Sequence, residues 1–251
     1  YKAGAFPGIE TPFDVAARLK LKHQTWTWKT PEDENRRGLE EAIRRGEDDF
    51  LFFYSPRLDA VMHTHGTRSQ PTADCLNDFE AFAHHMLELA QSSYREVRLL
   101  IFGDHGMADV HSSHDILGPL GSLGLRMPKH YLGFIDSTMA RFWFFEPGVR
   151  EQVEALLRAL PGGRIVEDDE LARLGILFPD RRYGEMIFLA DAGELFVPSF
   201  MGRSGPRAMH GYHPQHVDSD TILLANYNHA RVASIMDIGP LICRELEDLA
   251  R

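Results

Sequence analysis

The sequence predicts an α/β protein in which a mostly parallel sheet is flanked by helices and carries a small inserted α/β lobe. The continuous apolar run over residues 50–54 (FLFFY) and the segment 97–102, which ends in four apolar residues, are typical of strands buried on both faces. Between them, residues 74–91 repeat apolar side chains at helical spacing. A strand, a long helix and a second buried strand in this order favour a parallel sheet covered by helices.

The remaining segments extend this pattern in both directions. Helices are expected over residues 11–21, where Thr11 caps and Pro12 opens the helix, and over 33–45, 149–160 and 236–249. Strands are expected over residues 140–145 and 164–167, a buried strand over 221–226, and a hairpin formed by 185–190 and 194–198. We therefore expect a core α/β domain over 1–118 and 199–251, and a smaller α+β lobe over 119–198.

Charge and cysteine content narrow the range of functions. The formal net charge is −10, and such a protein is expected not to bind nucleic acids, because the phosphate backbone repels it. A bound metal cation could still attract an anionic substrate. The two cysteines, Cys75 and Cys243, form no CxxC pair and are expected to be buried free thiols in helices. No apolar run has the length of a membrane span.

Three motifs group side chains that could bind metal. In DAVMH, Asp59 and His63 would share one face of a helix. In GDHG, Asp104 and His105 follow the second buried strand, where ligands bind in such folds, and the two glycines would let the backbone turn sharply. The third motif, MHGYHP, contributes His210. Together they predict a metal centre. Oxygen and nitrogen ligands without cysteine suit zinc or manganese better than magnesium or calcium.

The segments LDAVMHTHG, IFGDHGM and MHGYHP, in this order and at these distances, resemble the type I phosphodiesterase/nucleotide pyrophosphatase family of the alkaline phosphatase superfamily. The resemblance implies an alkaline-phosphatase-like fold and a hydrolase of phosphoric esters that uses two divalent metal ions. Zinc is the preferred metal, with manganese as the alternative. The resemblance implies that Asp59, His63 and His210 hold one ion, and that Asp104 and His105 hold the other.

The family pattern also has an aspartate ligand and a Thr or Ser nucleophile, the latter in a Thr/Ser-x-Pro-Asn-His-like context. Neither is found in the 251 residues, and by motif order both are expected upstream of Tyr1. Further polar residues near the motifs are candidates for contacts with substrate or with the metal ligands: His65, Asp109, His114 and His213. The expected substrate is a small phosphate ester or a nucleotide.

Two other interpretations stay open at this stage. One is a truncated, catalytically inactive chain that binds metal. The other is a phosphomonoesterase, phosphonate hydrolase or sulfatase-like member of the same superfamily. The sequence leaves substrate, activity of the chain alone, oligomeric state and compartment undecided. With no visible signal peptide the cytoplasm is slightly favoured, although a targeting segment could precede Tyr1.

Overall fold

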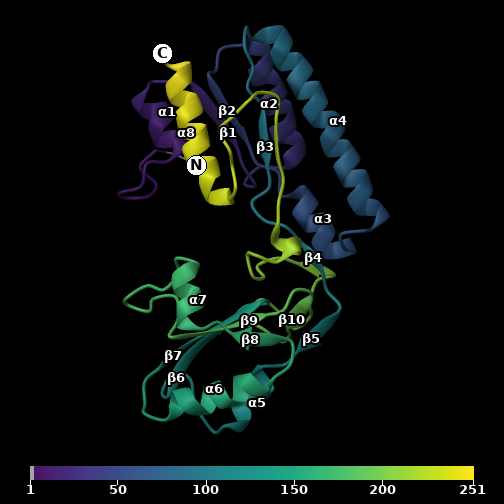
Figure 1. Ribbon diagram of the computed structural model, residues 1–251. Coiled ribbons are helices and arrows are strands. Elements are labelled where there is room, and N and C mark those ends of the chain that lie inside the picture. The colour runs from purple at the N-terminus through teal and green to yellow at the C-terminus, as the bar shows by residue number, and fades with distance from the viewer. Residues whose placement is uncertain (1–2) are drawn as a thin grey trace. The chain divides into compact units, whose positions relative to one another are not determined.

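A computed structural model describes residues 3–251, and these residues divide into two compact units. The first unit contains the residues up to Val61, Gln70–Asp104 and Thr221–Arg251, and the second contains Met62–Ser69 and His105–Asp220. Figure 1 labels their helices and strands. The fold is the α/β arrangement that the sequence predicts, and each unit is described by itself below.

The first unit is built around two parallel strands. β1 (His23–Trp26) pairs in parallel with β2 (Phe50–Phe53), and helix α2 (Glu32–Arg45) connects them. A parallel pair needs such a crossover connection. Helix α2 confirms the helix predicted over residues 33–45. Helix α4 (Gln70–Ser93) contacts α2 along its length, and the predicted helix over 74–91 lies within it (Figure 1).

Helices cover both faces of β2, as predicted. Leu51 and Phe53 point to one face and pack with buried residues of α2 and α4. On the opposite face, the rings of Phe50 and Phe52 contact Phe13 of helix α1 (Pro12–Arg18), with ring centroids 6.0 and 5.5 Å apart. All four strand residues nevertheless stay partly exposed, so the expected burial on both faces is only partial.

Helix α1 begins where the sequence predicts and ends earlier. Thr11 is its N-cap and forms a capping box with Asp14, while Pro12 occupies the first turn. The helix ends at Arg18 rather than near Leu21, because Lys20 adopts a left-handed conformation with φ of 58°.

Replacing Thr11 by alanine removes the side chain that caps α1. We expect the free energy of unfolding to fall by about 1 kcal/mol, since the amide and the carboxylate of Asp14 each lose a hydrogen bond with the Thr11 hydroxyl. Urea denaturation measures the change, and Thr30→Ala, at an exposed loop position, is the matched control. Equal stability of both variants and the parent protein would contradict the assigned cap.

The other strand pair of the first unit runs antiparallel. β3 (Leu100–Phe102) pairs with β12 (Leu223–Ala225), so the sheet is not parallel at this position. The strand predicted over residues 221–226 is confirmed, but its expected burial is wrong, because two of the three β12 residues are exposed. Helix α8 (Ile238–Leu249) closes the unit, preceded by the 3-10 turn Ile235–Asp237. Cys75 on α4 is buried and Cys243 on α8 is partly buried, and both are free thiols.

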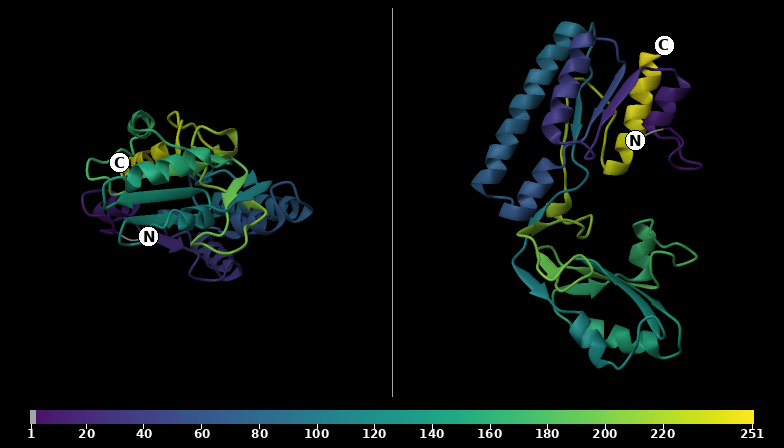
Figure 2. Two further views of the ribbon diagram at one scale, coloured as in Figure 1. Left: turned by 90° about the horizontal axis from the view of Figure 1, so that it is seen from below. Right: turned by 180° about the vertical axis from the view of Figure 1, so that it is seen from behind.

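The second unit is centred on a four-stranded antiparallel sheet of order β6-β7-β9-β8. Its strands are β6 (Tyr131–Ile135), β7 (Met139–Phe144), β9 (Met186–Ala190) and β8 (Gly163–Ile165). Helices α5 (Leu117–Ser122) and α6 (Val149–Ala159) cover one face and form the largest core with it (Figure 2). Helix α7 (Asp168–Arg173) packs on the other face. The predicted lobe over 119–198 lies inside this unit, and its boundaries stay a prediction.

Short strands outside this sheet position the histidine motifs. β10 (Glu194–Phe196) pairs in parallel with β5 (Ser112–His114), so the predicted hairpin of 185–190 and 194–198 is wrong. The turn over residues 191–193 (DAG) instead directs the chain away from β9 to a different partner strand. β11 (Ala208–Met209) pairs antiparallel with β4 (Ala108–Asp109), which brings the MHGYHP and GDHG motifs together. None of the described helices is both long and apolar enough to cross a membrane.

Candidate metal centre

Helix α3 (Arg57–His65) carries the first two predicted ligands. The spacing of Asp59 and His63 places them one turn apart, on the same face of this helix. Both side chains are partly buried. The helix end is held in place, because the amide of Arg207 donates to the carbonyl of His63 at 2.8 Å. The residue that precedes β11 therefore fixes the ligand-bearing turn of α3.

A backbone carbonyl orients the imidazole of His63. Its Nδ1 lies 2.7 Å from the carbonyl oxygen of Ala208 in β11. Because a carbonyl only accepts hydrogen bonds, Nδ1 must carry the proton, so Nε2 is the ring nitrogen that could coordinate a metal. Such a hydrogen bond on the second ring nitrogen is the usual support of a metal-binding histidine.

His210 completes a three-residue group with Asp59 and His63. Each of the three offers one ligand atom, and these atoms all lie within 4.8 Å of one another. The imidazole rings of His63 and His210 have centroids 5.2 Å apart. One carboxylate and two imidazoles is a donor set that fits zinc and related transition metals, and its compact arrangement supports a shared ion.

The chain turns sharply just after His210. Gly211 has a φ of 86°, a conformation that favours glycine, and its carbonyl accepts from the hydroxyl of Thr138 at 3.1 Å. A buried threonine next to β7 therefore fixes the direction in which the His210 loop leaves β11. This anchoring keeps His210 beside the end of α3 without any contact that depends on metal.

His105 stacks on His210, with ring centroids 3.8 Å apart and an interplanar angle of 21°. Its Nδ1 lies 2.9 Å from the carbonyl oxygen of Gly106, so Nδ1 carries the proton in this contact. Asp104 precedes it and is exposed. Among the described residues, Asp104 and His105 belong to no three-ligand group, so the second ion of the predicted pair stays a prediction.

The second glycine of GDHG, Gly106, is required for a reason other than the expected sharp turn. Gly106 does not have a positive φ. A Cβ built on it would lie only 2.2 Å from the carbonyl oxygen of Asp218 and 2.4 Å from that of Asp220. The amide of Gly106 also donates to the carbonyl of Ser219 at 3.2 Å. The position therefore needs glycine because another backbone segment packs directly against it.

Asp109 connects the loop after α3 to β4. Its carboxylate accepts from the amide and the hydroxyl of Thr67, at 2.6 and 2.8 Å. Gly66, with a φ of 88°, lies against the same carboxylate. His65, at the end of α3, is exposed. Asp109 thus holds the loop that follows α3, and its role toward substrate or the metal ligands stays a prediction.

His114 pairs with Glu194 across the β5–β10 pair. Its Nε2 lies 2.6 Å from the Glu194 carboxylate, and the ring fills the space above Gly162. Burial by itself would raise the pKa of Glu194, but the interactions with His114 and Ser112 outweigh it and lower the pKa. The observed contacts of His114 are thus to a carboxylate in its own strand pair.

His213 ties the MHGYHP loop to helix α7. Its Nε2 lies 2.8 Å from the carboxylate of Glu170, which also forms two 2.6 Å hydrogen bonds with Arg164. The interaction with Arg164, reinforced by His213, lowers the pKa of Glu170 from 4.5 to about 2. Glu170 therefore anchors the loop that carries His210, and the sequence analysis missed it.

Replacing Glu170 by glutamine should destabilise the protein in a pH-dependent way. Its pKa is lower in the folded state, so its stabilising effect is present above pH 4.5 and is lost as the pH falls toward about 2. Urea unfolding at neutral pH and at about pH 3 measures the difference, which should shrink in acid. Glu151→Gln, at an exposed position on α6, is the control. A pH-independent difference would contradict this assignment.

Comparisons with known proteins show what the sequence and the fold are similar to. Residues 7–123 match the sequence profile described as type I phosphodiesterase / nucleotide pyrophosphatase. A search of curated proteins found no match.

Solved structures share the fold at low sequence identity. Murine ectonucleotide pyrophosphatase/phosphodiesterase 5 matches with a TM-score of 0.75 and 16% identity, over 93% of this chain and 69% of that chain. The human protein of the same name gives the same values. Phosphonoacetate hydrolase from Sinorhizobium meliloti, in complex with phosphonoformate, matches with a TM-score of 0.60 and 14% identity, over 84% of this chain and 54% of that chain. These neighbours confirm the alkaline-phosphatase-like fold.

Proposed function

We propose that the protein is a metal-dependent hydrolase of phosphoric esters, because residues 7–123 match the type I phosphodiesterase / nucleotide pyrophosphatase profile. The observation that carries the proposal is the convergence of Asp59, His63 and His210. A second ion would be held by Asp104 and His105, next to the ring of His210. Zinc is the preferred metal, and manganese is the alternative.

The protein residues have separate tasks at this site. The carbonyl of Ala208 keeps the proton of His63 on Nδ1, so that Nε2 stays directed to the metal position. Asp59 supplies negative charge that partly balances a divalent ion. Such an ion, when bound, would polarise a phosphoryl oxygen and provide the positive charge that a protein of net charge −10 otherwise lacks for an anionic ester.

We place the attacking group in a Thr or Ser hydroxyl outside these 251 residues. No Thr or Ser here lies in the Thr/Ser-x-Pro-Asn-His-like context of the family. A structure of the murine relative, in which a threonine is replaced by alanine, is described as inactive and in complex with AMP. This supports a threonine nucleophile and a nucleotide-like substrate for the present protein.

Phosphonate hydrolysis is the second candidate, because one neighbour of the same fold is a phosphonoacetate hydrolase. The test is a comparison of three substrates with zinc-loaded protein that includes the segment proposed to carry the nucleophile: a nitrophenyl nucleotide diester, nitrophenyl phosphate and phosphonoacetate. We expect the diester to be hydrolysed fastest. Preference for phosphonoacetate would support the second candidate. Zinc binding without turnover of any of the three would support an inactive metal-binding chain and contradict the proposal.

A further inference from the structure

One face of the β6–β7 hairpin is open although it is rich in apolar side chains. Along β6, the buried residues alternate with exposed ones, so that Leu132 and Phe134 point away from the core formed with α5 and α6. Their cross-strand partners are Trp143 and Arg141, respectively. Outward positions of an antiparallel sheet are ordinarily polar, and here Arg141 is the only charged side chain of the four.

The rest of this sheet face is covered. Ile187 and Leu189 of β9 point to the same side and are buried with Leu171 of α7 and with Val166. Met139, at the start of β7, packs against this cluster. Because α7 protects β9 and the start of β7 only, the open area is confined to the outer part of the hairpin.

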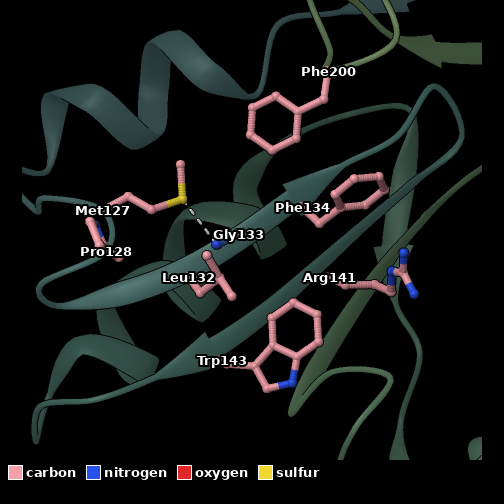
Figure 3. A pocket seen from close by; sticks show the side chains of 8 residues that line it. All are labelled: Met127, Pro128, Leu132, Gly133, Phe134, Arg141, Trp143 and Phe200. Carbon is pink, nitrogen blue, oxygen red and sulfur yellow. Dashed lines mark hydrogen bonds between the residues drawn. The ribbon is translucent and has the colours of Figure 1, made fainter.

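The open area forms a groove of about 590 Å³ with a floor of four hairpin side chains (Figure 3). Met127 and Pro128 bound it on one side and Phe200 on another. This volume is in the range of small-molecule sites. Leu132, Phe134 and Phe200 remain 43%, 37% and 49% exposed, so the groove is accessible to a ligand.

Three interactions hold the walls of the groove in place. The Trp143 indole donates to the carbonyl of Arg181 at 2.9 Å, and the Met127 sulfur accepts from the amide of Gly133 at 3.1 Å. Phe200 is tied to the end of β6, because its amide donates to the carbonyl of Ile135 at 2.9 Å. Its ring meets that of Phe134 edge-on, with centroids 5.7 Å apart. The aromatic surface is therefore preorganised.

Arg141 gives the groove its electrostatic character. Its guanidinium lies over the ring of Phe134 at 5.0 Å and near that of Tyr183 at 5.9 Å. Among the residues that the structure describes, Arg141 forms no ion pair, and its buried Nε has no hydrogen-bond acceptor. Five other arginines of this unit pair with carboxylates: Arg158, Arg164, Arg173, Arg181 and Arg182. A cation held against aromatic rings without a counter-charge can be satisfied by a bound anion.

We propose that this groove binds a small aromatic anion, whose ring lies against Leu132, Trp143 and Phe200 and whose acidic group pairs with Arg141. The apolar floor supplies the contact area, and the guanidinium selects for negative charge. The acidic group can be a carboxylate, a sulfonate or a phosphate. This site consists of residues other than those assigned to metal, and it does not depend on the proposed hydrolase activity.

Two fluorescent probes that differ in charge test the proposal. The anion 8-anilinonaphthalene-1-sulfonate should bind to one saturable site, about tenfold more tightly than the uncharged N-phenyl-1-naphthylamine. In Arg141→Gln this difference should disappear, while the affinity for the uncharged probe stays unchanged. Phe200→Ala should weaken both probes. Met236→Gln, which changes an exposed side chain of the first unit, is the control.

The outcomes separate a built site from general surface hydrophobicity. Equal affinity of Arg141→Gln and the parent protein for the anionic probe would overturn the proposal, as would the absence of saturable binding. Circular dichroism establishes whether Arg141→Gln is folded. If Arg141→Gln is not folded, Phe200→Ala is the deciding variant, because Phe200 lies in a loop. Unchanged affinity of Phe200→Ala for both probes would also overturn the proposal.

Discussion

Replacing His63 by alanine is expected to abolish tight zinc binding and to reduce hydrolysis of a phosphodiester by at least about 100-fold. His63 supplies one of the three converging ligand atoms, and its tautomer is fixed by Ala208. Removing a residue that only supports a metal ligand already costs about 10- to 100-fold, so loss of the ligand itself should cost more. Isothermal titration with zinc, together with a diester assay, measures both effects.

His84→Ala is the matched control for this prediction. His84 lies on helix α4 and is exposed, so its removal takes away an imidazole without touching the candidate site. It should bind zinc as the parent protein does. Wild-type zinc affinity in His63→Ala would show that His63 is not a ligand and would contradict the assigned site.

The second large effect is expected for Gly106→Ala. The added Cβ would meet the carbonyl oxygens of Asp218 and Asp220 at distances that real contacts essentially never show. Because both obstacles are backbone atoms, a rotamer change cannot relieve them, and the two segments must separate. We expect the free energy of unfolding to fall by about 3 kcal/mol, the upper part of the range for overpacking. Thermal and urea unfolding measure the change.

Gly121→Ala provides the comparison. Gly121 lies in helix α5, and a Cβ there meets nothing within 4 Å. Alanine should be neutral at this position or stabilise it by about 0.5 kcal/mol. In Gly106→Ala the displaced backbone should also move His105 and weaken zinc binding. A Gly106→Ala protein with unchanged stability would contradict the close packing of GDHG against residues 218–220.

The sequence predicted the elements of the first unit because their signals are local. The Thr11 cap with Pro12 located the start of α1, and apolar spacing located α2 and α4. The partner of each strand was harder to predict, because a short apolar run does not indicate which other strand it pairs with. The segments 185–190 and 194–198 illustrate this. Both form strands, but Glu194–Phe196 pairs with Ser112–His114 rather than with β9.

The residues of the candidate site were predicted by their type and motif, but Ala208 and Glu170 were not. Asp59, His63 and His210 stand in recognisable motifs, whereas the carbonyl of Ala208 carries no signal in the sequence. Glu170 lies 40 residues before His210 along the chain, in a run of charged residues that is typical of a solvent-exposed segment. Its contact with His213 depends on how β11 and α7 are placed in the second unit.

The most direct test of the account is anomalous diffraction at the zinc absorption edge from crystals grown with zinc. A strong anomalous peak is expected between Asp59 Oδ, His63 Nε2 and His210, at zinc–nitrogen distances of about 2.0–2.1 Å. Because His63 Nδ1 donates to Ala208, coordination through Nε2 is a specific part of the prediction. A crystal with zinc bound elsewhere and no peak at these three residues would contradict the central claim.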